Sequence, residues 1–130
     1  MTEHQEIAAN NHLLEGIRLT LPRLSEQDAV VLARIALRLI DAYSPERIYL
    51  FGSKARADFG PNSDFDLMIV VSDSAREDYK RSRLAYEVLW GIPTAVDALV
   101  WTRSRFERRA HLAASLPATI LREGILLYAA

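Results

Sequence analysis

The sequence predicts an α/β (α+β) fold, in which a small mixed sheet has helices packed against it. Three observations favour this class. Helical periodicity fills residues 1–44, three β-rich apolar runs follow between residues 47 and 101, and helical segments return after residue 103. The 130 residues, 50% of them hydrophobic, suit one domain with one core. We expect it to consist of an N-terminal helical segment (1–44), a central segment (45–102) and a closing segment of helices and a short strand (103–130).

Two helices are expected before residue 45. A short amphipathic helix ending near Pro22 is indicated by its apolar residues, which are Ile7, Leu13, Leu14, Ile17 and Leu21. Ser25 opens the second helix, and Asp28 has the third-position spacing from which both side chains can bond amides of the first turn. Within residues 29–43 the polar positions form one narrow stripe, made of Arg34, Arg38 and Asp41. This helix is therefore expected to be buried on most of its surface. Pro45 is expected to end it.

The central segment contains the predicted strands. The run Arg47–Phe51 is β-branched, aromatic and apolar, and Gly52 stops it, which is typical of a buried strand. Residues 53–58 suit a short helical turn, and Gly60, Pro61 and Asn62 give a strong turn signal. Residues 64–71 and 95–101 are expected to form the second and third strands, with one helix over residues 75–90 between them.

The closing segment is expected to return to helices. Ser104 and Glu107 repeat the spacing of a capping box, so a helix is predicted to begin at Ser104. A second short helix is predicted over residues 117–123, with Pro117 in its first turn and Gly124 as its cap. Residues 125–128 then suit a short edge strand.

Composition and charge exclude several classes of protein. Cysteine is absent, which excludes disulfides and cysteine-ligated zinc sites. A formal net charge of -1 makes nucleic acid an unexpected stable partner, and the arginine-rich stretches 76–83 and 103–109 suit solvated faces or protein interfaces. The start of the chain lacks the pattern of a signal peptide, and no apolar run approaches the roughly 20 residues of a membrane helix. We therefore expect a cytoplasmic protein without a membrane partner.

Asp64 and Asp66 are the first candidate site residues. They are two positions apart on a predicted strand, so their side chains face the same way, about 6.6 Å apart along the strand. The apolar residues that follow place both carboxylates at the mouth of a buried strand. Neighbouring carboxylates repel each other and Mg²⁺ prefers such oxygen ligands, so the pair predicts a cation site. For an isolated Asp-x-Asp pattern, a turn residue and a solvated strand edge are the ordinary alternative.

Gly52-Ser53 and Asp97 add context to this pair. A glycine after a strand lets backbone approach a phosphate, and a helix beginning at Ser53 offers free amides and a hydroxyl, although an ordinary capped turn has the same pattern. Asp97 lies within the apolar run AVDALVW, where a carboxylate is costly unless it faces solvent, is paired or binds a metal. If the second and third strands are neighbours, Asp97 converges on Asp64 and Asp66 as a two-metal phosphoryl-transfer site.

The combined motif resembles the signature of the DNA polymerase β-like nucleotidyltransferase superfamily, and the short chain is similar to its minimal nucleotidyltransferases. The resemblance covers residues 48–101: a Gly-Ser-Lys-Ala-Arg turn, the segment Ser63-Asp64-Phe65-Asp66-Leu67, and Asp97 on a later strand. The closing REGILLYA is also similar to that group. The family commonly has glycine where this chain has Ala57, a departure that concerns the local shape of the loop. The resemblance implies the family fold, with a single domain over residues 1–130 and its catalytic core at residues 45–102.

The resemblance also implies roles for individual residues. Three carboxylates would be catalytic and would hold two Mg²⁺ ions: Asp64, Asp66 and Asp97. The nucleoside triphosphate would be bound by four residues: Gly52, Ser53, Arg56 and Ser63.

By the same resemblance, the protein would transfer AMP from ATP to a hydroxyl and release pyrophosphate. Minimal members often act as antitoxins of HEPN ribonuclease toxins, and some add AMP to a tyrosine of the toxin. A HEPN-type toxin is therefore the expected partner, in a homo- or hetero-oligomer. Two other interpretations stay open: a non-catalytic antitoxin or binding module with a vestigial nucleotide site, and a subunit of a small-molecule (aminoglycoside-type) nucleotidyltransferase.

Overall fold

The centre of the fold is a mixed sheet, which the computed structural model shows within the residues it describes, 2–60 and 63–130. Its strands, in the spatial order β3-β2-β1-β4, are β1 (Arg47–Phe51), β2 (Phe65–Val71), β3 (Val96–Thr102) and β4 (Ile125–Ala129). β1 is antiparallel to both β2 and β4, whereas β2 and β3 are parallel. The predicted fold class is confirmed, and the predicted final strand lies at the edge of the sheet.

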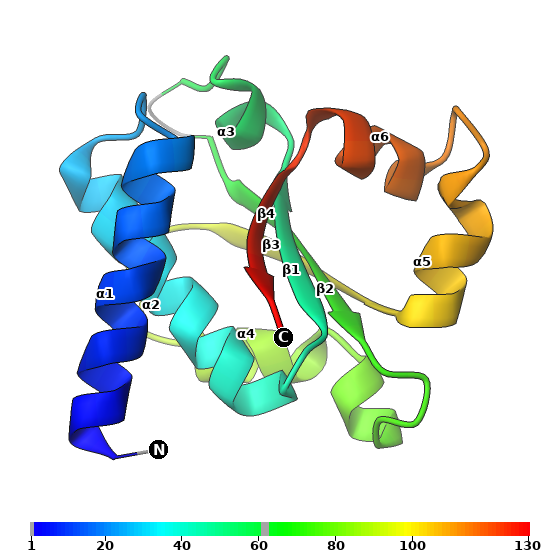
Figure 1. The fold of residues 1–130 in the computed structure, drawn as a ribbon, viewed down its shortest axis with the longest axis horizontal. Helices are drawn as coiled ribbons and strands as arrows, with labels where there is room; N and C mark the ends of the chain where they lie inside the picture. The colour runs from blue at the N-terminus through cyan, green and yellow to red at the C-terminus, as the bar shows by residue number, and fades with distance from the viewer. Residues whose placement is uncertain (1, 61–62) are drawn as a thin grey trace.

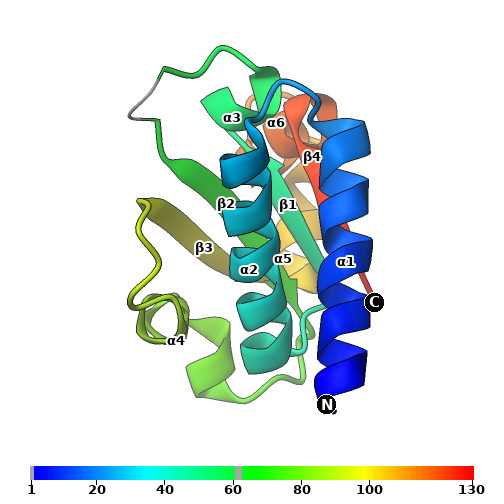
Figure 2. The same cartoon turned by 90° about the vertical axis from the view of Figure 1, so that its left-hand side faces the viewer.

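Helices cover both faces of this sheet (Figures 1 and 2). On one face lie α1 (Glu3–Thr20), α2 (Glu26–Tyr43) and α4 (Arg83–Val88), and on the other α5 (Arg103–Ala110) and α6 (Leu116–Glu123). Strand side chains alternate between two buried clusters. Leu67 and Ile69 pack with α2, whereas Met68 and Val70 pack with Phe106 of α5. Two of the catalytic candidates, Asp66 and Asp97, belong to this alternation, so it decides which face they occupy.

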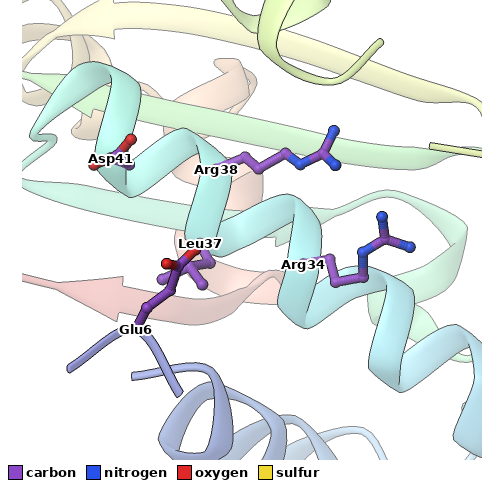
Figure 3. Close-up of a pocket in the computed structure, with 5 residues that line it drawn as sticks. All are labelled: Glu6, Arg34, Leu37, Arg38 and Asp41. Atoms are coloured by element: carbon purple, nitrogen blue, oxygen red, sulfur yellow. The ribbon is translucent and has the colours of Figure 1, made fainter. Parts of the chain in front are cut away.

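The second helix begins as predicted at its cap but differs in one partner. The Ser25 hydroxyl accepts from the Asp28 amide at 3.1 Å. Asp28 itself does not complete the capping box, because its carboxylate accepts a hydrogen bond from the Lys54 ammonium at 3.2 Å. The predicted polar stripe on α2 also borders a surface pocket beside α1 (Figure 3), lined by Glu6, Arg34, Leu37, Arg38 and Asp41.

The prediction of a single helix over residues 75–90 is wrong. A short 3-10 helix, η1 (Glu77–Lys80), and the later α4 are separated by an extended Arg81, with φ -122° and ψ 149°. The buried Tyr43 hydroxyl explains the break, since it donates to the Arg81 carbonyl and accepts from the Ala85 amide at 2.8 Å. A tertiary contact from α2 therefore replaces hydrogen bonds that a continuous helix would make.

The closing segment follows the prediction with a different helix start. α5 is capped by Thr102, whose hydroxyl accepts from the Arg105 amide, rather than by Ser104. The Ser104 amide donates instead to Asp73, and Glu107 pairs with Arg47 at 3.4 Å. Because β3 runs directly into α5, the last strand residue is the one placed to cap the helix. Among residues 2–60 and 63–130, the helices fall short of the length and hydropathy of a membrane span.

Candidate functional site

Asp66 and Asp97 lie side by side at one edge of the sheet. Each is the second residue of its strand, and the parallel register of β2 and β3 pairs them directly. Their side chains share the sheet face of Met68 and Leu99, opposite the face covered by α2. Asp66 is half-buried and Asp97 is exposed. The condition set from the sequence, that the second and third strands be neighbours, is therefore met.

Asp64 lies just outside the strand on which it was predicted. β2 begins at Phe65, and Asp64 is an exposed residue of the segment that leads into it. Its charge nevertheless acts on Asp66, since it is one of the groups that raise the pKa of that carboxyl. The prediction that strand alternation fixes the direction of the Asp64 side chain is therefore wrong.

Gly52 is packed against the Asp66 carboxylate. It follows β1, whose last residue, Phe51, lies opposite Asp66 in the antiparallel register. Gly52 has a φ of +74°, and a Cβ built on it would lie 2.1 Å from Asp66 Oδ2. Both the backbone conformation and the space require glycine here. A backbone turn and an acidic side chain are therefore in direct contact.

The electrostatics of this cluster favour a cation. Burial raises the pKa of Asp66 above its ordinary value, and the charges of Asp97 and Asp64 raise it further. Arg56 is the opposing charge that lowers the pKa. A cation among the carboxylates would offset both the lost hydration and the mutual repulsion. The donor set, made of carboxylate oxygens, suits a hard divalent ion such as Mg²⁺.

The other predicted nucleotide-binding residues are divided between the site and its surroundings. Ser53 is half-buried in the first turn of α3 (Ser53–Arg56), directly after Gly52. Arg56 forms ion pairs with Asp58 at 3.2 Å and with Glu123 of α6 at 3.9 Å. These two contacts hold its guanidinium at the edge of the candidate site. The Ser63 hydroxyl accepts from the Gly60 amide at 2.9 Å. The predicted turn residues Pro61 and Asn62 lie outside the described residues.

One residue at the site and one that packs behind it were not predicted from the sequence. The Tyr86 hydroxyl lies 3.4 Å from Asp97 Oδ1, to which it donates, and 3.4 Å from the Ala98 amide. Lys54, which follows Ser53, is buried on the α2 side of the sheet, where it contacts Asp28 and Phe65. Tyr86 could be placed near Asp97 only by knowing how α4 lies against β3. Lys54 gave no signal, because lysine is almost never fully buried.

At Ala57, where the family commonly has glycine, the backbone adopts a conformation that favours glycine. Ala57 ends α3 with a φ of 62° and a ψ of 25°, which is the left-handed conformation. Glycine adopts this conformation at no steric cost, whereas a Cβ costs about 1–2 kcal/mol. The turn also shortens the helix predicted over residues 53–58 to four residues.

Ala57→Gly is therefore expected to stabilise the protein. The net gain should be about 1 kcal/mol, which corresponds to a melting temperature higher by about 2–5 °C. Ala55→Gly is the matched control, because Ala55 lies inside α3, where glycine should destabilise. Thermal unfolding of both variants tests this, and a melting temperature for Ala57→Gly at or below that of the wild type would contradict it.

In the part of the chain that the structure describes, no group of three His, Cys, Asp or Glu side chains is arranged to hold a metal ion by itself. This observation bears on what completes the site. Mg²⁺ is commonly held by one or two carboxylates together with substrate phosphates and water, rather than by an all-protein cage. The in-register Asp66 and Asp97, exposed toward solvent on one side, suit that arrangement.

Known proteins share this domain and this fold. A family model described as "Nucleotidyltransferase domain" matches residues 32–127. The structure is similar to that of a protein described as a nucleotidyltransferase from Sulfolobus solfataricus, at 16% identity and a TM-score of 0.52, over 95% of this chain and 86% of the other. It is also similar to a toxin-antitoxin solved with AMP-PNP, at 21% identity and a TM-score of 0.50, over 75% of this chain and 73% of the other. At these identities the two structures bear on the fold alone. No curated protein matches the chain.

Proposed function

Because this chain belongs to the nucleotidyltransferase domain family, we propose that it transfers a nucleoside monophosphate, specifically AMP from ATP, to a hydroxyl group. The observation that carries the proposal is the in-register pair Asp66 and Asp97, with Gly52 packed against Asp66. This arrangement joins a glycine turn suited to phosphates with carboxylates suited to cations. Phosphoryl transfer needs little more than positioning and neutralisation of charge, which are the two functions these residues can supply.

Two Mg²⁺ ions are the proposed cofactor, held by Asp64, Asp66 and Asp97. The fit rests on the carboxylate donors and on the raised pKa of Asp66, which burial and the neighbouring acidic charges cause. Bound Mg²⁺ supplies neutralisation of the charge that develops on the phosphate oxygens. We propose that Gly52 and Ser53 hold the triphosphate.

The proposed step is an in-line displacement at the α-phosphorus of ATP. The acceptor oxygen forms a bond to the α-phosphorus, the bond from that phosphorus to the bridging oxygen breaks, and pyrophosphate leaves. Asp97 is exposed and can meet the incoming hydroxyl, whose proton it takes up. The Tyr86 hydroxyl donates a hydrogen bond to Asp97 Oδ1 and so restricts the orientation of the carboxylate. We propose that Arg56 and Ser63, at the edge of the site, help to bind the phosphates of the nucleotide.

The proposed acceptor is a tyrosine on a partner protein, a HEPN-type toxin that this chain counters as an antitoxin. The family resemblance leads to this partner, and the similarity to a toxin-antitoxin structure is consistent with it. The surface beside Asp97 supports a protein acceptor. Trp90 is 87% exposed and lines a hollow with Tyr86, which itself reaches Asp97. Exposed tryptophan and tyrosine are the residue types most enriched at protein interfaces.

A labelling experiment tests the transfer. The protein is incubated with α-labelled ATP, Mg²⁺ and the protein encoded beside it, with Asp97→Asn as the control. Because Asp97 is exposed, the control should fold normally. We expect label on the partner with wild type and at least about a 100-fold slower reaction with the control. Equal labelling by both proteins would contradict the assignment of Asp97.

The same experiment distinguishes the other two interpretations. A non-catalytic antitoxin or binding module predicts neutralisation of the partner without label and without Mg²⁺-dependent binding of millimolar ATP. A small-molecule nucleotidyltransferase predicts label on an aminoglycoside rather than on the partner protein. Parallel reactions with aminoglycosides and with RNA 3′ ends therefore identify the acceptor class.

A further inference from the structure

Lys54 is the one charged side chain in the described residues that is buried, with 5% of its surface exposed. It is the second residue of α3 and directly follows Ser53. Burial of an ammonium group is costly unless charge and hydrogen-bond partners replace its hydration. The partners that compensate Lys54 therefore indicate what it does.

Three segments of the chain meet at the Lys54 ammonium. Nζ lies 3.2 Å from Asp28 Oδ2 in the first turn of α2. It also lies 4.6 Å from the centroid of the Phe59 ring and 4.8 Å from that of Phe65. Both distances are within the range of a cation–π interaction, which strengthens when the cation is desolvated. One side chain thus joins α2, the loop after α3 and the start of β2.

The geometry assigns Lys54 as a positioning residue of the candidate site. On one side it is continuous with Gly52-Ser53, and on the other it contacts Phe65, the residue immediately before Asp66. It therefore links the turn proposed to hold phosphate to the start of the strand that carries Asp66, from the α2 face of the sheet. This assignment rests on the proposed function for its catalytic meaning, whereas its structural part stands on the contacts alone.

A first experiment tests the structural part without any activity. Lys54→Met removes the charge and keeps the length of the side chain. Lys80→Met is the matched control, because the chain has only these two lysines and Lys80 pairs at the surface with Glu77. We expect hydrogen exchange at least about 10-fold faster in Lys54→Met at the amides bonded within the turn, which are those of Ala55, Arg56, Ala57 and Asp58. Amides in β1 and β2 should keep their wild-type rates.

Asp28→Asn is the second variant, since it keeps the ammonium and removes only the charge of its partner. It should accelerate exchange at the same four amides by a smaller factor. Exchange that is equally accelerated throughout the chain in both variants would overturn the assignment, because it would show a role in global stability alone. Wild-type exchange at the turn in Lys54→Met would also overturn it.

A second experiment tests the link to the site through Mg²⁺-dependent ATP binding. We expect the dissociation constant to rise about 10-fold in Lys54→Met, to stay unchanged in Lys80→Met, and to be partly restored in Lys54→Arg, which retains a cation. Binding as tight in Lys54→Met as in wild type would overturn the positioning role. Absence of binding by the wild type itself would instead refute the proposed function, and the exchange result would still decide the assignment of Lys54.

Discussion

Replacing Asp66 by asparagine is expected to abolish nucleotidyl transfer and, in the absence of metal, to raise the melting temperature. The loss of activity should be at least about 100-fold, because a carboxylate at the centre of the proposed cation site is removed. The gain in stability follows from the pKa of Asp66, which burial raises first and the charges of Asp97 and Asp64 raise further. Asparagine has nearly the same shape and carries no charge.

The sign of the stability effect follows from linkage. A carboxyl whose pKa is higher in the folded than in the unfolded protein stabilises the fold while it is protonated, below its unfolded pKa. That contribution is lost as the pH rises through the folded pKa, so at neutral pH the ionised Asp66 destabilises the metal-free protein. We expect Asp66→Asn to melt a few degrees higher in EDTA at pH 7. The difference should shrink as the pH falls through the raised pKa of folded Asp66 and should be gone below the ordinary pKa of aspartate.

Mg²⁺ with ATP should reverse this order. Ligand binding to the folded state should raise the melting temperature of the wild type and leave that of Asp66→Asn nearly unchanged. Asp41→Asn, on the exposed stripe of α2, is the matched control and should behave as wild type in both conditions. If Asp66→Asn melts below the wild type in EDTA, or retains transfer activity, the proposed electrostatic role of Asp66 is wrong.

Gly52→Ala is expected to cause the largest combined loss of stability and activity. The new methyl would lie 2.1 Å from Asp66 Oδ2, so the carboxylate or the turn must move. The φ of +74° adds backbone strain, because residues with a Cβ rarely adopt a positive φ. Together we expect a loss of about 2–4 kcal/mol in the free energy of unfolding and at least about a 100-fold loss in kcat/KM.

Denaturant unfolding and transfer kinetics measure both effects. Gly16→Ala is the control, since Gly16 lies in α1 with no atom within 4 Å of an added Cβ. It should stabilise the protein by about 0.5–1 kcal/mol. A double-mutant cycle with Asp66→Ala separates the clash from the backbone strain. Simple additivity of the two changes in the free energy of unfolding would show that the Asp66 carboxylate is not the group that requires glycine.

Local patterns were sufficient to predict the sheet and most of the helices. Arg47–Phe51 is bounded by Pro45 and Gly52 and was predicted with the observed bounds. The predicted capping by Ser25 was also confirmed. The errors arose where a distant group supplies the hydrogen bonds. The Tyr43 hydroxyl interrupts the helix predicted over residues 75–90, and Asp73 takes the Ser104 amide.

The candidate site could be predicted only as a set of residue types. Asp66 and Asp97 are 31 positions apart, and their contact depends on which strands are neighbours, which alternation alone does not specify. The packing of Gly52 against Asp66 depends on the register of β1 with β2. The burial of Lys54 depends on partners from three segments. These features are tertiary contacts, and no local pattern in the sequence predicts them.

The parallel pairing of β2 with β3 has a consequence for how the chain acquires its site. β1 and β2 are joined by a short connection and can pair early, which brings Gly52 against Asp66. Asp97 arrives only after the crossover between Val71 and Val96 has closed, which is a slower, non-local event. A chain still emerging from the ribosome can thus possess the turn at Gly52 and one carboxylate but not the pair. The proposed transfer activity would therefore begin only after the crossover is complete.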